Sequence, residues 1–335
     1  MPARFLGTVV IVSHNSGGCI RACLQALLPF TKWKVVLVDN NSTDDTVSKA
    51  GTASPGMHTL INSHNAGFAG AVNQAAEVAE GDVLVILNPD TLATPGSLDK
   101  LAEALRADTV GAAGGLLLSE GGLPQKGFTV RRFPTLGNML AEVLLVNRAW
   151  PGNTWNVRYR CLDLDYQNAQ EVEQPAGACL AVKRQAWDEV AGFDEGFFPV
   201  WFEDVDFCRR LRDREWKIVY CPDAIFSHAG GHSVSSLAFR DRQSYWYKNL
   251  LRYFVKHHTR TQLAILRVGI TMGLLLRALL SLVGFSPSGT SVPEAVEAYW
   301  HAAWRYAVRG TDLKSISARQ SCSRVTDASE IERLR

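Results

Sequence analysis

The sequence predicts an α/β fold, a Rossmann-like, mostly parallel sheet flanked by helices, and three observations predict it. Short apolar runs alternate with helical segments between residues 8 and 118. The run Val83–Leu87 is apolar throughout and ends at Pro89, which is typical of a strand buried on both faces and stopped by proline. Polar residues follow each of the first four predicted strands. Such alternation gives parallel strands with right-handed crossovers.

The first half of the chain supplies these elements in order. The expected strands are 8–13, 35–38, 57–61, 83–87 and 110–118, and the expected helices are 19–28, one that ends near 79, and 95–107. His14, Asp39, Asn65 and Asp90 each follow a strand, and the carboxyl ends of parallel strands meet at one edge of a sheet. We therefore expect these four side chains in one crevice. Taken alone, Asp90 fits a turn residue as well as a metal ligand.

Residues 119–175 show less regular patterns. The segment 120–124 predicts a hairpin turn with 125–132 returning from it, and 150–170 is expected to be a loop. Gly177 belongs to a Gly/Ala turn that leads into a strand of small residues. Small residues at that point leave room for a ligand beside the backbone.

An acidic triplet follows an aromatic-rich loop. Glu203, Asp204 and Asp206 stand at the start of a predicted helix, where they can cap the helix or serve in catalysis. Residues 216–220 and 223–228 are extended, and the second segment ends at His228. His232 follows after a Gly-Gly turn. Two histidines around such a turn favour a metal or phosphate site.

From residue 235 onward the pattern is helical. The segment 263–285 is apolar over 23 positions and is long enough to span a bilayer. Arg267 and Arg277 interrupt it, and each would cost about 2.5–3.5 kcal/mol near the bilayer centre. A helix at the membrane surface and a core helix are therefore both favoured over a spanning helix. Residues 311–335 are expected to form a polar tail.

Composition excludes several classes of protein. The chain has 335 residues, 47% of them hydrophobic, and a net charge of +2, which provides no strong field for nucleic acid. Its seven cysteines form no CxxC pair, so neither a zinc ribbon nor a disulfide framework is indicated. The N-terminus lacks the pattern of a signal peptide, and we expect a cytoplasmic protein. The dinucleotide fingerprint and the P-loop are both missing.

Seven segments in order carry a resemblance to a known family. They are VVIVSHNS, VVLVDNNSTDDT, NAGFAGAVNQA, VLVILNPDT, GACLAVKRQAWDEVAGFDEGFF, WFEDVDFCRRL and IFSHAGGHS. Together they resemble the GT-A glycosyltransferases of family 2, and within them the bacterial rhamnosyltransferase-like group. The resemblance implies inverting, metal-dependent transfer of a sugar, with L-rhamnose from dTDP-rhamnose as the best choice. It also implies a dTDP- or UDP-sugar donor and a glycan or polyprenyl-diphosphate-linked acceptor in cell-surface polysaccharide synthesis.

The resemblance also implies roles for individual residues. Asp39 is similar to the aspartate that binds the donor base. The rest of the nucleotide and diphosphate pocket is implied to be His14, Asn15, Asn41, Asn65, Gly67, Phe68, Asn73 and Asn88. Asp90 resembles the metal-binding aspartate of a DxD motif, with Asn88 in the place of the first Asp, and would bind Mg²⁺ or Mn²⁺. His228 resembles a further metal ligand, with His232 as the alternative. Asp204 resembles the catalytic base, with Glu203 beside it.

The expected organisation has three parts. Residues 1–258 form the glycosyltransferase domain, with a nucleotide half at about 1–118 and an acceptor half at about 119–258. Residues 259–310 form a helical extension that can contact the inner face of the cell membrane, and 311–335 the tail.

Two other functions are open. The first is a sugar nucleotidyltransferase, although the loop at 14–18 lacks the basic residues that hold a triphosphate. The second is a non-catalytic subunit that binds nucleotide sugars.

Overall fold

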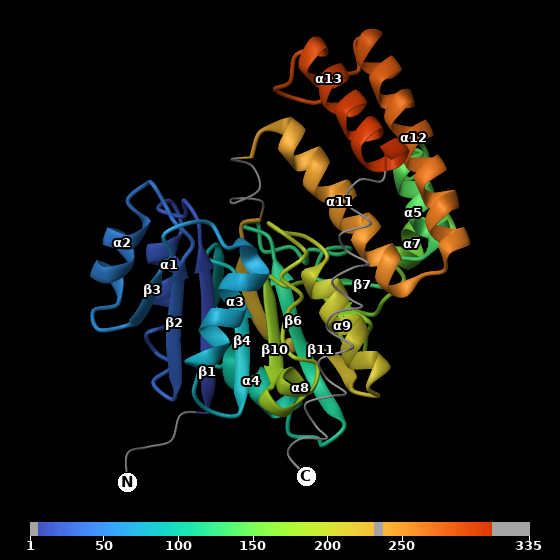
Figure 1. Ribbon diagram of the computed structural model, residues 1–335. Coiled ribbons are helices and arrows are strands. Elements are labelled where there is room, and N and C mark those ends of the chain that lie inside the picture. Colours follow the sequence, from blue (N-terminus) through green and yellow to red (C-terminus); the bar gives the residue numbers. More distant parts are fainter. Residues whose placement is uncertain (1–5, 231–236, 310–335) are drawn as a thin grey trace, which may run out of the picture. The chain divides into compact units, whose positions relative to one another are not determined.

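The computed structural model describes residues 6–230 and 237–309, so His232 and the tail at 311–335 lie outside the described residues. Contacts divide the chain into two compact units (Figure 1). The first combines residues 1–134 with 156–236, and the second combines 135–155 with 237–335. The segment 237–258 thus belongs to the second unit, whereas the sequence pattern groups it with the catalytic domain.

The first unit is a layered α/β structure. Its strands are β1 (Gly7–Ser13), β2 (Trp33–Asp39), β3 (His58–Ile61), β4 (Val83–Leu87), β5 (Thr91–Ala93), β6 (Val110–Leu118), β7 (Val130–Arg131), β8 (Gln170–Glu171), β9 (Gln174–Pro175), β10 (Cys179–Lys183) and β11 (Lys217–His228). Its helices are α1 (Ile20–Leu27), α2 (Thr46–Ala53), α3 (Gly67–Glu77), α4 (Ser97–Ala104), α8 (Arg184–Glu189) and α9 (Glu203–Asp213), with α7 (Thr154–Tyr159) at the boundary between the units.

The main sheet confirms the predicted fold class. Within the described residues its order is β3-β2-β1-β4-β10-β6-β11-β5, and β8 pairs with β11. The first four strands in this order are parallel, with Ser13 opposite Asp39 and Asp39 opposite Ile61. β10 runs antiparallel between β4 and β6, so the sheet is mostly but not wholly parallel.

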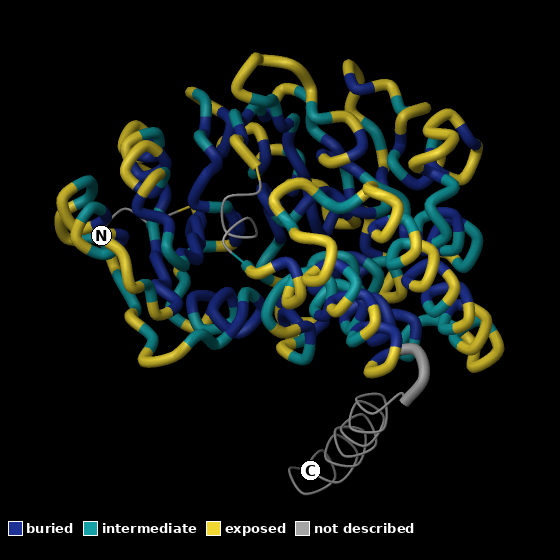
Figure 2. Tube along the Cα trace, turned by 90° about the horizontal axis from the view of Figure 1, so that it is seen from above, coloured by how far each residue is buried: buried dark blue, intermediate teal, exposed yellow. Residues whose placement is uncertain are grey.

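Two buried layers cover the sheet, because successive residues of a strand point to opposite faces. Val9 and Ile11 pack with side chains from α1, α2 and α4. Val10 and Val12 pack with side chains from α3, α8 and α9. β1 and β4 are accordingly buried along their whole length. Figure 2 marks the buried and exposed residues along the chain.

The less regular middle of the chain departs from the sequence pattern in part. The predicted hairpin turn is confirmed, since Ser119 N donates to Leu123 O at 2.8 Å. The loop predicted over 150–170 is wrong, because α7 occupies 154–159. The two extended segments near residue 220 form one strand, β11, whose pairing with β6 is irregular between Cys221 and Ile225.

The second unit is helical. It contains α5 (Leu136–Val143), α6 (Val146–Ala149), α11 (Phe239–His257), α12 (Arg260–Leu282), α13 (Val292–Ala302) and the π-helical segment η1 (Ala303–Arg309). One face of α12 packs against α5 and α13, with Leu266, Ile270 and Leu274 fully buried. The guanidinium of Arg277 on this helix donates to the carbonyl oxygens of Val143 and Glu142 near the end of α5. Arg277 therefore satisfies carbonyl groups at a helix C-terminus.

The opposite face of α12 carries exposed apolar side chains. Val268, Met272, Leu279 and Leu282 are 59–62% exposed. Within the described residues α12 alone is long and apolar enough to cross a membrane, by length and composition. The helix is thus buried along one side and apolar along the other.

Candidate active site

Asp39, the last residue of β2, has a buried carboxylate that orders the loop after the strand. Ser13 Oγ, at the end of β1, donates to Asp39 Oδ1 at 2.9 Å. Ser42 donates to the same carboxylate from its backbone nitrogen at 2.9 Å and from its hydroxyl at 2.6 Å. Because the parallel register places Ser13 opposite Asp39, the sheet itself produces the first of these contacts.

Asn40, which was not predicted as a site residue, makes most of the side-chain hydrogen bonds of the neighbouring turn. Its Nδ2 donates to Asn65 Oδ1 at 2.9 Å and to Gly67 O at 3.1 Å. Its Oδ1 accepts from Ala66 N at 2.8 Å and from Asn62 Nδ2 at 3.1 Å. The side chain is 2% exposed, so each of these partners matters for its burial. Asn40 thereby holds the end of β2 against the start of α3.

The loop after β1 folds onto the same turn. His14 Nδ1 lies 2.9 Å from Asn40 O, and Asn15 Oδ1 accepts from Thr43 N at 2.8 Å. Asn15 and Asn41 have φ angles of 52° and 64°, in the left-handed region that asparagine tolerates better than most residues. His14, Asn15, Asn41 and Asn65 are therefore brought together at the ends of β1, β2 and β3.

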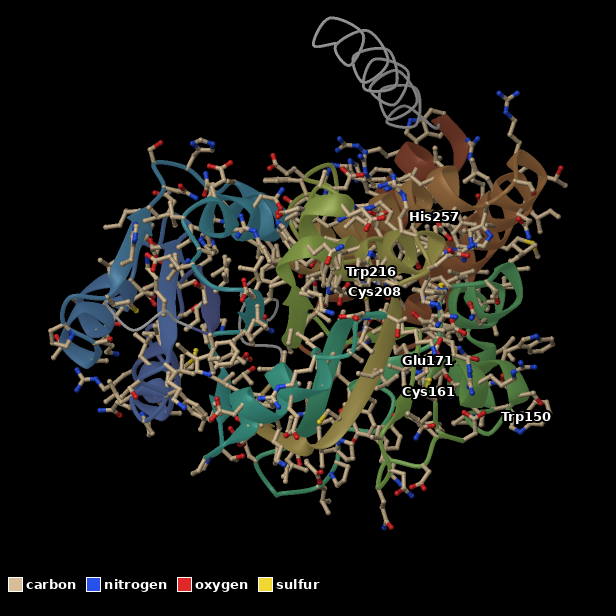
Figure 3. All side chains as sticks on the ribbon, turned by 90° about the horizontal axis from the view of Figure 1, so that it is seen from below. Trp150, Cys161, Glu171, Cys208, Trp216 and His257 are labelled. Carbon is tan, nitrogen blue, oxygen red and sulfur yellow. The ribbon has the colours of Figure 1, made fainter. Side chains whose placement is uncertain are left out.

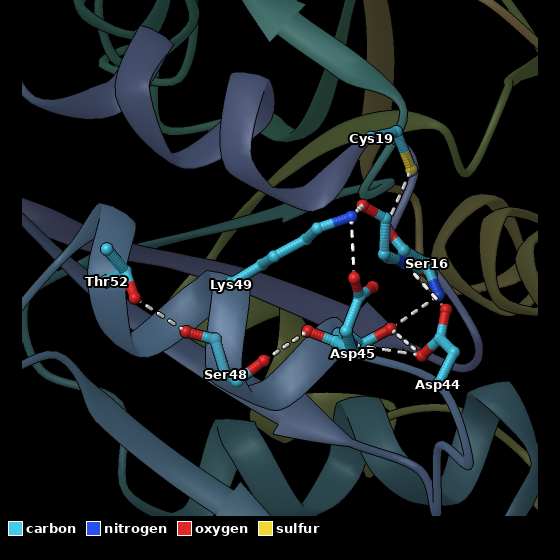
Figure 4. Close-up of polar contacts among 9 residues, drawn as sticks. Ser16, Cys19, Asp44, Asp45, Ser48, Lys49 and Thr52 are labelled. Atoms are coloured by element: carbon cyan, nitrogen blue, oxygen red, sulfur yellow. Dashed lines mark hydrogen bonds and ion pairs between the residues drawn. The ribbon is translucent and has the colours of Figure 1, made fainter.

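Charged groups in α2 and just before it hold the beginning of this loop in place (Figure 4). Lys49 Nζ donates to Gly17 O at 2.9 Å and pairs with Asp45 at 2.9 Å. Gly17 N donates to Asp44 Oδ2 at 2.9 Å. Partial burial raises the pKa of Asp44. Hydrogen bonds from Thr46 and Gly17 outweigh this effect and hold its pKa below the usual value. These contacts hold the 14–18 loop close to the 40–46 loop.

Three predicted donor residues lie on α3 against the loop at 193–199. Phe68 N donates to Pro199 O at 2.7 Å, and Gly67 has a φ of 77° that favours glycine. Asn73 Nδ2 donates to Phe193 O at 2.9 Å, and its Oδ1 accepts from Phe193 N at 2.9 Å. Because both ends of the Asn73 amide are used in this way, its contacts support the loop.

Asp90, which follows β4, and His228, the last residue of β11, come together. β5 pairs antiparallel with the end of β11, which places Thr91 opposite His228. His228 Nε2 lies 3.5 Å from Asp90 Oδ1, and the two residues are 2% and 6% exposed. Burial lowers the pKa of His228, and the Asp90 carboxylate opposes that shift. The pairing depends on β5, a three-residue strand that the sequence analysis did not predict.

Gln125 is a second residue that the sequence analysis did not single out. Its Oε1 lies 2.9 Å from His228 Nδ1, and its Nε2 donates to His228 O at 2.8 Å. The ring of Phe128 stacks on the imidazole with centroids 5.0 Å apart. The only sequence signal was the position of Gln125 directly after the hairpin turn.

The Asp90–His228 pair fits a divalent cation. Asp90 Oδ1 is buried and has no hydrogen-bond partner among the described residues, which is costly unless a cation neutralises it. Within the described part of the chain, no group of three or more His, Cys, Asp and Glu side chains is arranged to hold a metal. A bound Mg²⁺ or Mn²⁺ would therefore take its remaining ligands from substrate oxygens and water, as these ions commonly do.

Asp204 stands at the start of α9 with its carboxylate directed at the turn before β10. Gly177 N donates to Asp204 Oδ2 at 2.9 Å, and Gln174 Nε2 donates to the same oxygen at 3.1 Å. Burial raises the pKa of Asp204, although the N–H groups of Gly177 and Val205 act against the shift. A Cβ on Gly177 would lie 3.1 Å from Asp204 Oδ2. The space beside Gly177 is thus taken by Asp204, not by a ligand.

The other two acids of the triplet have different surroundings. Glu203 is 4% exposed, and burial and the Asp204 charge raise its pKa well above the usual value. Asp206 is fully buried and pairs with Arg210 Nε at 2.8 Å. Arg210 also donates to Gly192 O at 2.7 Å, so Asp206 braces the start of the aromatic loop. One triplet therefore contains a hydrogen-bonded carboxylate, a buried acid and a structural ion pair.

The turn before β10 joins the two carboxylate sites. Gly177 holds Asp204, and the next residue, Ala178, accepts from Asn88 N at 3.0 Å and from Thr91 Oγ1 at 3.3 Å. Asn88 O in turn accepts from Thr91 N at 3.1 Å, which closes the turn that carries Asp90. Insertion of β10 beside β4 thus links Asp204 to the Asp90 turn through the adjacent residues Gly177 and Ala178.

A separate hollow of about 220 Å³ lies in the same unit beside Cys161 and Glu171, which Figure 3 shows next to each other. Its two arginines are already paired. Arg132 binds Asp163 through two hydrogen bonds, and Arg212 pairs with Glu171 at 3.1 Å.

Comparison with known proteins decides the family. A model of glycosyl transferase family 2 matches residues 8–160, and a model of glycosyl transferase family group 2 matches residues 154–308. The N-acetylglucosaminyl-diphospho-decaprenol L-rhamnosyltransferase of Mycobacterium tuberculosis is 32% identical over 278 residues, which cover 74% of this chain and 88% of the relative. The chain belongs to glycosyltransferase family 2. Among the functions left open by the sequence, family membership supports the glycosyltransferase.

Solved structures show the same fold for this glycosyltransferase. A mannosyltransferase from Pyrobaculum calidifontis, solved with GDP-Man and Mn²⁺, has a TM-score of 0.51 at 17% identity and covers 90% of this chain and 87% of its own. GalNAc-T7, solved with UDP, GalNAc and Mn²⁺, has a TM-score of 0.52 at 14% identity and covers 92% of this chain and 57% of its own. The expected GT-A fold is confirmed.

Proposed function

We propose that this glycosyltransferase moves L-rhamnose from dTDP-β-L-rhamnose to an N-acetylglucosaminyl-diphospho-polyprenol acceptor in the cytoplasm. The observation that carries the proposal is the 32% identity, over most of both chains, to an enzyme named for that acceptor and sugar. The site described above supports the chemistry. It combines polar side chains at the strand ends, a buried carboxylate–histidine pair and a separate hydrogen-bonded carboxylate.

The donor would lie along the ends of β1 to β4. The residues proposed to line its nucleotide and diphosphate are His14, Asn15, Asp39, Asn41, Asn65, Gly67, Phe68 and Asn88. Asp39 and Asn65 already accept hydrogen bonds from the protein, so their main effect is to shape the loops that meet the donor. Asn73 supports the loop at 193–199 and through it the same pocket.

Asp90 and His228 would hold Mg²⁺ or Mn²⁺ on the donor diphosphate. The cation would stabilise the negative charge of the leaving nucleoside diphosphate. Asp90 supplies an unpaired carboxylate oxygen, and His228 supplies a ring nitrogen. The relatives solved with Mn²⁺ share only the fold, so Mg²⁺ and Mn²⁺ are equal candidates.

Asp204 would accept the proton of the acceptor hydroxyl as that oxygen attacks the anomeric carbon. The hydrogen bonds from Gly177 and Gln174 hold the carboxylate in one position, and partial burial makes it more basic than a free aspartate. One base and one displacement invert the anomeric carbon, so a β-linked donor gives an α-linked product. Glu203 would stay protonated beside Asp204, which avoids two adjacent negative charges.

Purified enzyme tests this function directly. With dTDP-β-L-rhamnose, a synthetic acceptor of the proposed class and Mg²⁺ or Mn²⁺, we expect an α-rhamnosylated product by mass spectrometry and NMR. Asp204→Asn should lower turnover by about 10²–10⁴-fold and leave donor binding nearly unchanged. Asp90→Ala should weaken metal-dependent donor binding. Full activity of Asp204→Asn would end the assignment of the base, and turnover only with another nucleotide sugar would end that of rhamnose.

We also propose that the exposed face of α12 rests on the lipid surface that carries the acceptor. Its apolar side chains would enter the interface without crossing it, because Arg277 is engaged with α5. We expect flotation of the enzyme with phosphatidylethanolamine–phosphatidylglycerol vesicles. The pair Leu279→Ser and Leu282→Ser should reduce it, whereas Leu123→Ser, at a leucine of the first unit that is 71% exposed, should not. Equal flotation of both variants would contradict this.

A further inference from the structure

The side-chain amide of Gln125 contacts both the backbone oxygen and the ring Nδ1 of His228. We propose that Gln125 is a positioning residue that keeps His228 in the tautomer with Nδ1 protonated and Nε2 free to bind a cation. The proposal rests on the metal site proposed above and adds a residue to it. Its consequence is that loss of the Gln125 acceptor oxygen weakens metal binding although Gln125 does not contact the metal.

The chemistry of the partners dictates which way the amide points. The carbonyl oxygen of His228 can only accept, so the group 2.8 Å from it must be the Gln125 NH₂. The other end of the amide, Oε1, then faces His228 Nδ1 at 2.9 Å. An amide oxygen can only accept as well, so Nδ1 must carry the hydrogen. One backbone carbonyl therefore determines the tautomer of the ring.

The remaining nitrogen then faces a carboxylate. In this tautomer of the neutral ring, Nε2 presents a lone pair, and it lies 3.5 Å from Asp90 Oδ1. Neither atom can donate to the other, and Asp90 Oδ1 has no hydrogen-bond partner among the described residues. Two buried acceptors that face each other are stabilised by a cation bound to both. Histidine ligands of metals commonly donate their second N–H to a carbonyl or carboxylate in this way.

Gln125 is itself held firmly. Its backbone nitrogen donates to Leu117 O at 2.9 Å, and its backbone oxygen accepts from Phe128 N and Thr129 N at 3.1 and 3.0 Å. The Phe128 ring covers one face of the imidazole. Stacking limits the tilt of the ring but does not distinguish its nitrogens, so the tautomer depends on Gln125.

The test compares four variants with the wild-type enzyme, using Mn²⁺ alone as the probe. Electron paramagnetic resonance of free Mn²⁺ gives the dissociation constant, and ¹⁵N-histidine NMR gives the tautomer, with the His228 signals assigned by their loss in His228→Ala. Gln125→Met removes the acceptor at nearly constant length, and Gln125→Glu retains it. Gln167→Met is the matched control at an exposed glutamine.

We expect Nδ1–H in the wild-type enzyme and weaker Mn²⁺ binding by about 10–100-fold in Gln125→Met. Gln125→Glu should retain the tautomer and most of the affinity, and Gln167→Met should match the wild type. A wild-type spectrum with Nε2–H would overturn the proposal even if Gln125→Met did not fold. Unchanged Mn²⁺ affinity in His228→Ala would instead overturn the metal site. Loss of binding in His228→Ala with wild-type affinity in Gln125→Met would overturn only the role of Gln125.

Discussion

The contact between Gly177 and Asp204 leads to a prediction that can be worked out from distances. In Gly177→Ala the new Cβ would lie 3.1 Å from Asp204 Oδ2 and 3.2 Å from Asp204 Cβ, whereas ordinary contacts begin at 3.4 Å. The carboxylate must therefore move by about 0.3 Å, and the hydrogen bond from Gly177 N must lengthen. Because a misplacement of about 1 Å can cost about 10²-fold, a shift of about 0.3 Å should lower kcat by roughly 4-fold.

The same variant should change the pH dependence. The N–H of Gly177 opposes the rise in the pKa of Asp204, so weakening that bond should raise the pKa further. A base must be deprotonated to act, and the acid limb of the kcat profile should therefore move to higher pH. Rhamnosyl transfer followed from pH 4 to pH 8 measures both effects. Gly51→Ala is the control, since a Cβ there meets no atom within 4 Å. Wild-type kcat with an unshifted acid limb in Gly177→Ala would refute the reasoning.

Two further predictions concern stability. Asn40→Ala should lower the free energy of unfolding by about 3 kcal/mol in urea titrations, because it leaves buried partners unsatisfied, whereas Asn168→Ala on the surface should change it by less than about 0.5 kcal/mol. Equal effects would contradict the role of Asn40. The pKa of Glu203 is raised on folding, so its contribution to stability is fully present below its unfolded pKa and is lost as pH rises toward the folded pKa. Glu203→Gln should remove that decline between pH 5 and pH 8, and an unchanged pH dependence would argue against a protonated Glu203.

Local patterns predicted the strands better than their pairing. The apolar run Val83–Leu87 identified β4, and the polar residues after β1, β2 and β3 marked the loops that contact one another at the strand ends. The sequence did not indicate that β10 would lie antiparallel between β4 and β6, because strand order depends on contacts between distant segments. β5 has three residues and owes its structure to pairing with β11, so no periodic pattern reveals it.

Some side chains of the candidate site could be predicted from the sequence, and others could not. Asp90, Asp204 and His228 stand at ends of elements and could be named from the sequence. Asn40 and Gln125 act through bonds to backbone groups far along the chain, and an isolated Asn or Gln carries no sign of such partners. Helix α5 was also missed, although Thr135 and Asn138 form a capping box, because Asn replaces the usual Glu or Gln of that motif.

The order in which the chain is made gives the interleaving of the two units a consequence for folding. During synthesis α5 emerges more than one hundred residues before α12, the helix whose buried face and Arg277 it contacts. The first unit has its last strand by residue 228, so it can fold while α5 still waits for its partner. A chain that ends at residue 258 would leave α5 without α12, its packing partner. The carbonyl groups of Glu142 and Val143 would also lack the hydrogen bonds from Arg277. A shortened form of this enzyme should therefore retain α12 even when only catalysis is of interest.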